Sequence, residues 1–171
     1  MPDHQFLWDV FEKVDKNKSG RITASELQEA LSNSTWAPFN IETVRLMIRM
    51  FDMDHSGNIS FKEFGSLWQY IVDWQNCFRS YDRDNTNSID RGELATALNT
   101  FGYHFGPRTI NCILAHFIRL GRGTILFDDF IRCCVQLHTM KEAFEKRDLN
   151  KDGLLTIEFE HFVEMVYTIN I

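Results

Sequence analysis

The stretch that decides the fold is Asp52-Met53-Asp54-His55-Ser56-Gly57-Asn58-Ile59-Ser60-Phe61-Lys62-Glu63. Oxygen-bearing side chains stand at its positions 1, 3 and 5, glycine at position 6 and glutamate at position 12. Calcium takes about six to eight hard oxygen ligands, the chain must turn sharply at position 6 to surround the ion, and a bidentate glutamate closes the far side. The pattern therefore predicts a calcium-binding loop between two helices, the EF-hand.

The same pattern recurs, so that five loops begin at residues 15, 52, 82, 118 and 148. The loop from Asp15 to Glu26 is complete. The loop from Asp82 to Glu93 has Asn87 in place of glycine, and asparagine tolerates a left-handed backbone, so we expect it to bind. Counting the backbone carbonyl at position 7, the predicted ligands of the first three loops are Asp15, Asn17, Ser19, Arg21, Glu26, Asp52, Asp54, Ser56, Asn58, Glu63, Asp82, Asp84, Thr86, Ser88 and Glu93.

The last two loops are degraded in different ways. Where the fourth should carry ligand oxygens it has Ile118, Leu120 and Arg122, so we expect it to bind no calcium and to have a structural role. The fifth has Phe159 at position 12, and without the bidentate glutamate we expect a weak site. The ligands that the fifth loop still offers are Asp148, Asn150, Asp152 and the backbone carbonyl of Leu154.

The spacing of the loops predicts the helices between them. Loops that start 30 residues apart leave 18 residues between them, about 27 Å of helix, which is one helix without a linker. We therefore expect single long helices over 64–81 and 130–147, and two helices with a turn in each of the longer steps. The predicted fold class is all-α: five EF-hands with about eight helices and short two-stranded pairings between loops. We expect a single domain, 1–171, with hands one and two in 6–73, three and four in 74–140, and the fifth in 141–171.

The fifth hand has no partner within the chain. EF-hands pair through short strands in adjacent loops, so the first should pair with the second and the third with the fourth. The fifth hand and its apolar tail, 162–169, are then left uncovered, and exposed patches of this kind mark interfaces. We predict a homodimer joined through the fifth hand. A heterodimer, or a tail that folds back on its own chain, are the alternatives.

Five hands, shared helices and an unpaired last hand make the sequence resemble the penta-EF-hand family over essentially its whole length. The resemblance implies a calcium sensor and calcium-dependent adaptor that recognises proline-rich segments of proteins in membrane traffic and repair. It also implies hydrophobic partner pockets, for which plain core packing is the alternative reading, lined by Trp36, Trp68, Trp74, Phe101, Phe127 and Leu137. The rival functions are a regulatory subunit of an enzyme heterodimer, like calpain small subunits, and a calcium buffer.

Charge supports the same reading. The chain has 18 Lys and Arg against 24 Asp and Glu, a formal net charge of −6, which has the wrong sign for a nucleic-acid groove or constitutive binding to anionic membranes. Three calcium ions would add six positive charges, and −6 plus 6 is zero. We therefore expect calcium to promote self-association, membrane recruitment and partner capture.

The number of carboxylates also orders the sites: four in the third loop, three in the second and two in the first. We expect the third to bind most tightly, at about 10⁻⁷–10⁻⁵ M.

The sequence has no H-E-x-x-H, no G-x-S-x-G and no phosphate-binding glycine loop, so we expect no enzyme activity. No signal peptide is recognisable, which predicts a cytoplasmic protein recruited by calcium to endoplasmic reticulum and endosomal membranes, with the nucleus as a further location.

Overall fold

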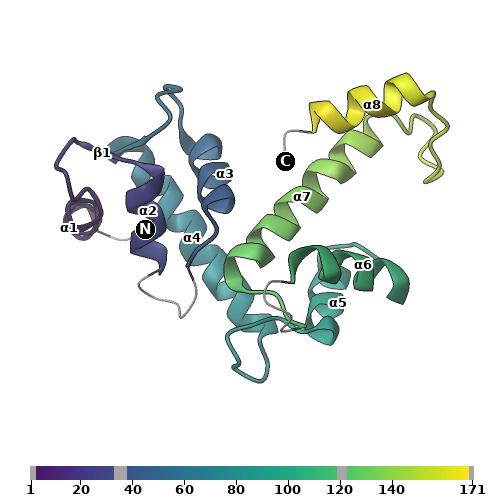
Figure 1. Ribbon diagram of the computed structural model, residues 1–171, viewed down its shortest axis with the longest axis horizontal. Helices are drawn as coiled ribbons and strands as arrows, with labels where there is room; N and C mark the ends of the chain where they lie inside the picture. The colour runs from purple at the N-terminus through teal and green to yellow at the C-terminus, as the bar shows by residue number, and fades with distance from the viewer. Residues whose placement is uncertain (1–2, 33–37, 119–122, 170–171) are drawn as a thin grey trace. The chain divides into compact units, whose positions relative to one another are not determined.

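The structure, a computed structural model, describes residues 3–32, 38–118 and 123–169. It is mostly helical (Figure 1). Over the described residues the helices are α1 (His4–Val14), α2 (Ala24–Ser32), α3 (Ile41–Phe51), α4 (Phe61–Tyr81), α5 (Arg91–Thr100), α6 (Pro107–Phe117), α7 (Phe127–Glu145) and α8 (Phe159–Thr168). The strands are β1 (Arg21–Ile22) and β2 (Ile59–Ser60). The predicted all-α class is therefore confirmed.

The chain packs as two compact units, Met1–Phe130 and Ile131–Ile171. The first holds α1 to α6 and the start of α7, and the second holds the rest of α7 and α8. The grouping of all five hands into one domain stays a prediction.

Both long helices exist. Helix α4 runs unbroken from the second loop into the third, and its side chains at 64, 67, 71 and 78 are buried at helical spacing. It begins three residues before the predicted start because a capping box between Ser60 and Glu63 starts it within the loop. Helix α7 likewise begins at Phe127, at the same position of its loop. The first turn of an exit helix thus belongs to the calcium loop itself.

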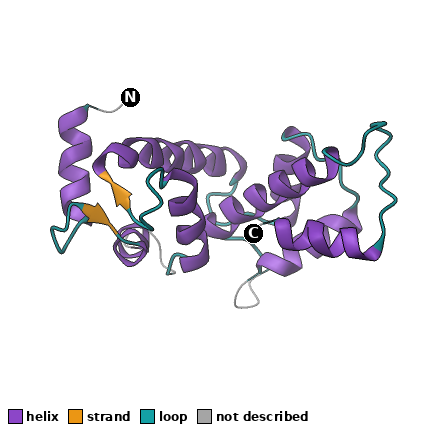
Figure 2. Cartoon of the chain, turned by 90° about the horizontal axis from the view of Figure 1, so that it is seen from above, coloured by secondary structure: helices purple, strands orange, loops and turns teal. Residues whose placement is uncertain are grey.

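The predicted pairing of hands is confirmed by two short antiparallel contacts. Strands β1 and β2 lie side by side (Figure 2), with Arg21 opposite Ser60 and Ile22 opposite Ile59. The third and fourth loops meet at an isolated bridge, in which the N–H groups of Ile89 and Ile125 each donate to the other's carbonyl at 2.8 Å. The four isoleucines at position 8 are fully buried, so each pair of loops is also joined by apolar packing.

Candidate calcium-binding loops

The aspartate at position 1 ends the helix that enters each of the first three loops. The backbone N–H groups of Asp15, Asp52 and Asp82 donate to the carbonyls four residues earlier, at 2.8, 2.8 and 3.0 Å. Their side chains then accept backbone N–H groups from positions 5 and 6 of the same loop, at 2.7 to 3.0 Å. The loop backbone therefore wraps around the carboxylate at position 1 and fixes its direction.

The sharp turn within each loop depends on left-handed backbone at positions 4 and 6. Position 4 has φ of 54° to 55° at Lys18, His55 and Asn85. Position 6 has φ near 78° at the glycines of the first two loops, and 58° at Asn87. The left-handed conformation expected of Asn87 is thus confirmed, and the third loop keeps the shape of the other two.

The glutamate at position 12 is buried at the start of each exit helix. Glu26, Glu63 and Glu93 each accept the backbone N–H of position 9, at 2.9, 2.8 and 3.0 Å. Glu63 and Glu93 also accept the N–H of position 2 at 2.8 Å. Burial opposes ionisation of Glu63, but hydrogen bonds from Ser60 and the backbone outweigh it and lower its pKa. The pKa of Glu26 is lowered against the same burial cost by hydrogen bonds from Thr23.

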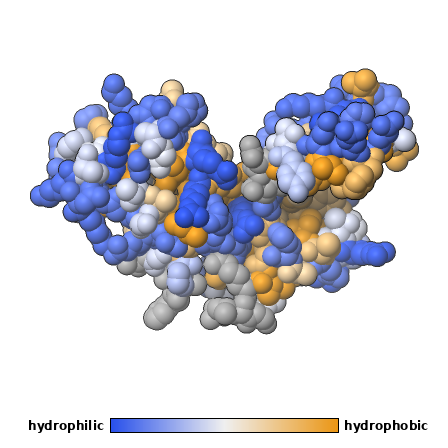
Figure 3. Space-filling view, turned by 45° about the horizontal axis from the view of Figure 1, so that its top comes forward, coloured by the Kyte–Doolittle hydropathy of each residue, from blue (hydrophilic) through white to orange (hydrophobic). Residues whose placement is uncertain are grey.

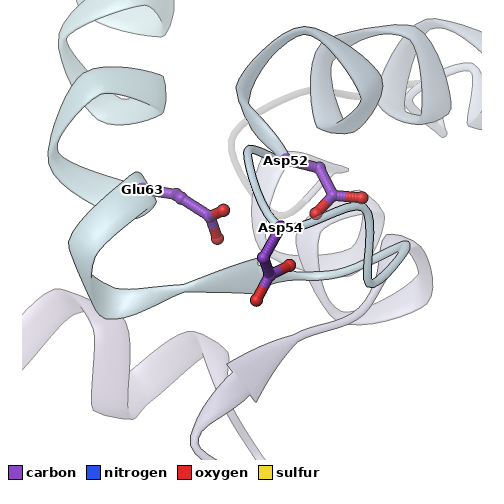
Figure 4. A group of neighbouring side chains, drawn as sticks. All are labelled: Asp52, Asp54 and Glu63. Carbon is purple, nitrogen blue, oxygen red and sulfur yellow. The ribbon is translucent and has the colours of Figure 1, made fainter.

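Two loops bring three carboxylates together. In the second loop, oxygens of Asp52, Asp54 and Glu63 all lie within 4.8 Å of one another, with Glu63 pointing from α4 toward the two aspartates (Figure 4). The third loop places Asp82, Asp84 and Glu93 in the same way. Three negative charges at this separation repel one another, and a cation coordinated by hard oxygens relieves that repulsion. Both loops fit a calcium ion.

The first loop has Asn17 in place of a third carboxylate and repeats most of the same contacts, but its Glu26 accepts the N–H of Asn17, at position 3, at 3.3 Å. Asn17 Oδ1 accepts the N–H of Ser19 at 2.8 Å, as Asp54 Oδ1 accepts the N–H of Ser56 at 3.1 Å. The first loop is thus preorganised by most of the same hydrogen bonds, with less negative charge. Arg21, at position 7, is the first residue of β1, and its carbonyl accepts the Ser19 hydroxyl at 2.9 Å.

The fourth loop keeps the turn and the strand. Gly123 has φ of 73°, and Ile125 pairs with Ile89. Ile118 ends α6 as its C-cap residue, and Leu120 and Arg122 lie outside the described residues. Where the fourth loop is described, its contacts are those of a pairing partner for the third loop.

The fifth loop is half formed. Asp148 is 7% exposed and its Oδ2 accepts the N–H of Gly153 at 2.9 Å, but its buried Oδ1 has no hydrogen-bond partner among the described residues. Asn150 and Asp152 bond to each other at 2.8 Å, and the N–H of Leu154 donates to Asp152. A buried carboxylate oxygen without a hydrogen-bond partner is unfavourable, and a bound cation would provide that partner.

The exit helix of the fifth loop starts late. The four helices α2, α4, α5 and α7 begin at position 10 of their loops, whereas α8 begins at position 12, at Phe159. In the first three loops the glutamate at position 12 accepts the N–H of position 9 and so starts the helix early. Phe159 has no acceptor and is 80% exposed. The sequence identified the missing ligand, but not this shortening of the helix.

The predicted pocket residues lie in several aromatic groups. In the first unit Trp68 packs near Phe6 and Phe64, and Trp74 near Tyr70 and Phe130. Phe101 lies against Tyr81, while Phe127 lies against Phe39 and Phe78. Leu137 is half-buried in the second unit, and Trp36 lies outside the described residues. These neighbours fit core packing as well as pocket lining, and the pockets stay a prediction.

Helix α8 has no buried residue among those described. Hydrophobic side chains reach the surface of the second unit (Figure 3). Those of the fifth hand that are exposed are Leu149, Leu154, Phe159, Phe162, Val166 and Tyr167. The predicted uncovered tail is thus present on the outside of its own unit.

The side chain of Arg21 has a contact that the sequence analysis does not predict. The sequence predicts only the backbone carbonyl of Arg21 as a calcium ligand, yet its guanidinium reaches the second loop and pairs with Asp54 at 2.9 Å. The hydrogen bond from Arg21 lowers the pKa of Asp54. Opposite charges at position 7 of one loop and position 3 of its paired loop are the signal that could have found it.

Among the described residues, no helix combines the length and apolar character needed to cross a bilayer.

Comparisons with known proteins give the context of these loops. The family model described as an EF-hand domain pair matches residues 6–69, and one described as an EF-hand domain matches 73–102. Sorcin from Schistosoma japonicum is 46% identical over 167 residues, 98% of this chain and 97% of that protein. Peflin from Xenopus laevis is 38% identical over 95% of this chain, which spans 57% of the length of that peflin.

A solved structure of a homolog of programmed cell death 6 protein from Leishmania major Friedlin has the same fold. It matches with a TM-score of 0.84 and 31% identity, covering 95% of this chain and 93% of that one. Short motifs such as Asp73-Trp74-Gln75-Asn76 and Phe101-Gly102-Tyr103 likewise resemble the apoptosis-linked gene 2 protein, which is of this programmed cell death 6 type.

Proposed function

Because the chain belongs to the penta-EF-hand family of calcium-binding proteins, we propose that it is a calcium sensor and calcium-dependent adaptor rather than an enzyme. The observation that carries the proposal is the clustering of three carboxylates in each of two loops, within 4.8 Å, where a bound calcium ion would relieve their repulsion. The first, second and third hands hold calcium, the fifth holds it weakly and the fourth does not.

Calcium changes the charge and the exposed surface together. Loading three loops neutralises the net charge of −6, and the glutamate at position 12, which belongs to the exit helix, links that helix to the bound ion. In sensor EF-hands the helix movement that follows calcium binding uncovers an apolar groove. Aromatic side chains suit preformed polyproline helices, so the captured partners are proline-rich proteins of membrane traffic and repair, in processes that include apoptosis.

The partner of the fifth hand is a second copy of the chain. Support comes from the apolar side chains of α8, of which Tyr167 is 83% exposed, and from the fact that no strand pairing of the fifth loop is seen among the described residues. Burial of such a face in a two-fold interface removes it from water. The protein works in the cytoplasm and is recruited by calcium to endoplasmic reticulum and endosomal membranes.

Calorimetry and a hydrophobic dye test the proposal together. Micromolar calcium should bind with measurable heat, and the fluorescence of the dye should rise with calcium and fall with chelator. Heat without a change in dye binding would leave a passive buffer. Absence of heat at micromolar calcium would remove the proposal altogether. Native mass measurement separates a homodimer from the heterodimeric regulatory subunit of an enzyme.

A further inference from the structure

The side chain of Arg21 belongs to the first hand but contacts the ligands of the second. Its two terminal nitrogens donate to the two oxygens of Asp54, at 2.9 and 3.4 Å, and one of them also donates to Ser56 Oγ at 2.6 Å. Asp54 and Ser56 are positions 3 and 5 of the second loop, and both are predicted to bind calcium. We infer that Arg21 is an internal competitor for calcium at the second site and sets its affinity.

The first step of the argument is geometric. Arg21 lies opposite Ser60 in the β1–β2 pairing, so the register of the strands fixes the point from which its side chain extends across the loop. The contact is a fork with a third hydrogen bond, which is more specific than a single lysine contact would be. The arginine therefore binds oxygens that calcium needs, and the register of β1 against β2 places it there.

The second step is electrostatic. Asp52, Asp54 and Glu63 repel one another in the metal-free loop, and the guanidinium offsets part of that repulsion. A bound calcium ion would share Asp54 with a positive group, or would displace that group into water. Both effects favour the metal-free state, so Arg21 should weaken the second site. The two side chains are 41% and 47% exposed, so water and salt screen the effect and keep it moderate.

The third step is specificity. The third loop has the same carboxylate arrangement. In the part of the chain that the structure describes, Asp84 accepts no hydrogen bond from an arginine, but it does accept one from Thr86. The two sites thus differ by a removable side chain as well as by the number of carboxylates. The inference rests on the proposed function, and it gives a reason for the second and third hands to fill at different calcium concentrations.

The test compares Arg21→Gln with Lys62→Gln, each of which removes one positive charge. Lys62 lies in the second loop, so its substitution measures the general effect of charge, while Arg21→Gln also removes the fork and keeps the carbonyl at position 7. Calcium titrations followed by the amide resonances of Gly20, Gly57 and Asn87 report the three loops separately. Arg21→Gln should tighten the transition of Gly57 by about three- to tenfold, and clearly more than Lys62→Gln does.

Three further results are expected. Arg21→Lys, which keeps the charge but loses the fork, should have a calcium affinity between those of the wild type and Arg21→Gln, the difference at Gly57 should shrink at high salt, and the metal-free Arg21→Gln protein should melt at a lower temperature. Equal transitions of Gly57 in the wild type and Arg21→Gln, or equal effects of the two substitutions, would overturn the inference. A wild type that shows no calcium transition in any loop would instead overturn the proposed function.

Discussion

The backbone at position 6 is the residue-scale feature on which the third loop depends. Asn87 has φ of 58°, a conformation that costs most residues about 1–2 kcal/mol but costs asparagine less. Asn87→Ala should therefore destabilise the metal-free protein by about 1 kcal/mol and weaken the third site. Asn87→Gly, the matched control, should do neither. Chemical unfolding in chelator and calcium titration measure the two effects, and equal behaviour of both variants would contradict the role of the turn.

Removal of the glutamate at position 12, one loop at a time, tests the predicted order of affinity. The third loop has the most carboxylates in its sequence and no competing arginine on its position-3 aspartate among the described residues, so it should fill first. Glu93→Ala should remove the tightest transition in calorimetry, whereas Glu63→Ala and Glu26→Ala should remove weaker ones. The closing ligand is lost in each case, so a drop in affinity of more than about a hundredfold is expected at the altered site. A tightest transition that survives Glu93→Ala would refute the order.

Acid should destabilise the metal-free protein through the same residues. The pKa values of Glu26 and Glu63 lie below the ordinary 4.5 in the folded state, so their hydrogen bonds stabilise the fold above that pH. This contribution is lost as the pH falls from 4.5 through the folded pKa. Thermal melting in chelator should show a steep fall in Tm over that range, and Glu63→Gln, which cannot ionise, should flatten the curve. An unchanged slope in Glu63→Gln would contradict the assignment.

At the scale of the elements, the fifth hand shows what one residue does to a helix. Phe159→Glu supplies a carboxylate that the N–H of Thr156 can reach, by analogy with Thr23 and Glu26 in the first loop. Helix α8 should then begin two residues earlier, at position 10, and the fifth site should tighten by about tenfold or more. Calorimetric stoichiometry and amide protection of Thr156 check the two effects. Phe159→Gln, which removes the same ring without adding charge, should leave the site weak.

The elements also show how far the sequence alone could go. The loops, the two long helices and the pairing of hands were predictable because each depends on local spacing, as from Asp52 to Glu63. The ion pair between Arg21 and Asp54 was missed, because the opposite charges at positions 7 and 3 of paired loops become a signal only when the register of β1 against β2 is taken into account. The late start of α8 was missed for a related reason: the capping role of position 12 becomes visible only when helices with and without a carboxylate at that position are compared.

On the scale of the whole molecule, the exposed face of the fifth hand should control assembly. Tyr167→Asp and Val166→Asp place a charge within an apolar interface and should weaken the dimer by about tenfold or more. Phe105→Asp, at an exposed aromatic position in the first unit, is the control and should leave the dimer intact. Sedimentation velocity in chelator, where further self-association is suppressed, measures the change. Dimers that persist in both fifth-hand variants would exclude this face as the interface.

Calcium should act on the whole molecule by two separable routes, loss of charge and exposure of apolar surface. Light scattering should rise as three loops fill and the formal charge approaches zero. High salt with chelator screens the same repulsion without moving any helix, and sulfate-free potassium chloride avoids a strengthened hydrophobic effect. If scattering rises equally in salt and chelator, charge alone drives association and the sensor mechanism is unnecessary. We expect salt to have little effect, because the apolar surface needed for association beyond the dimer appears only when calcium binds.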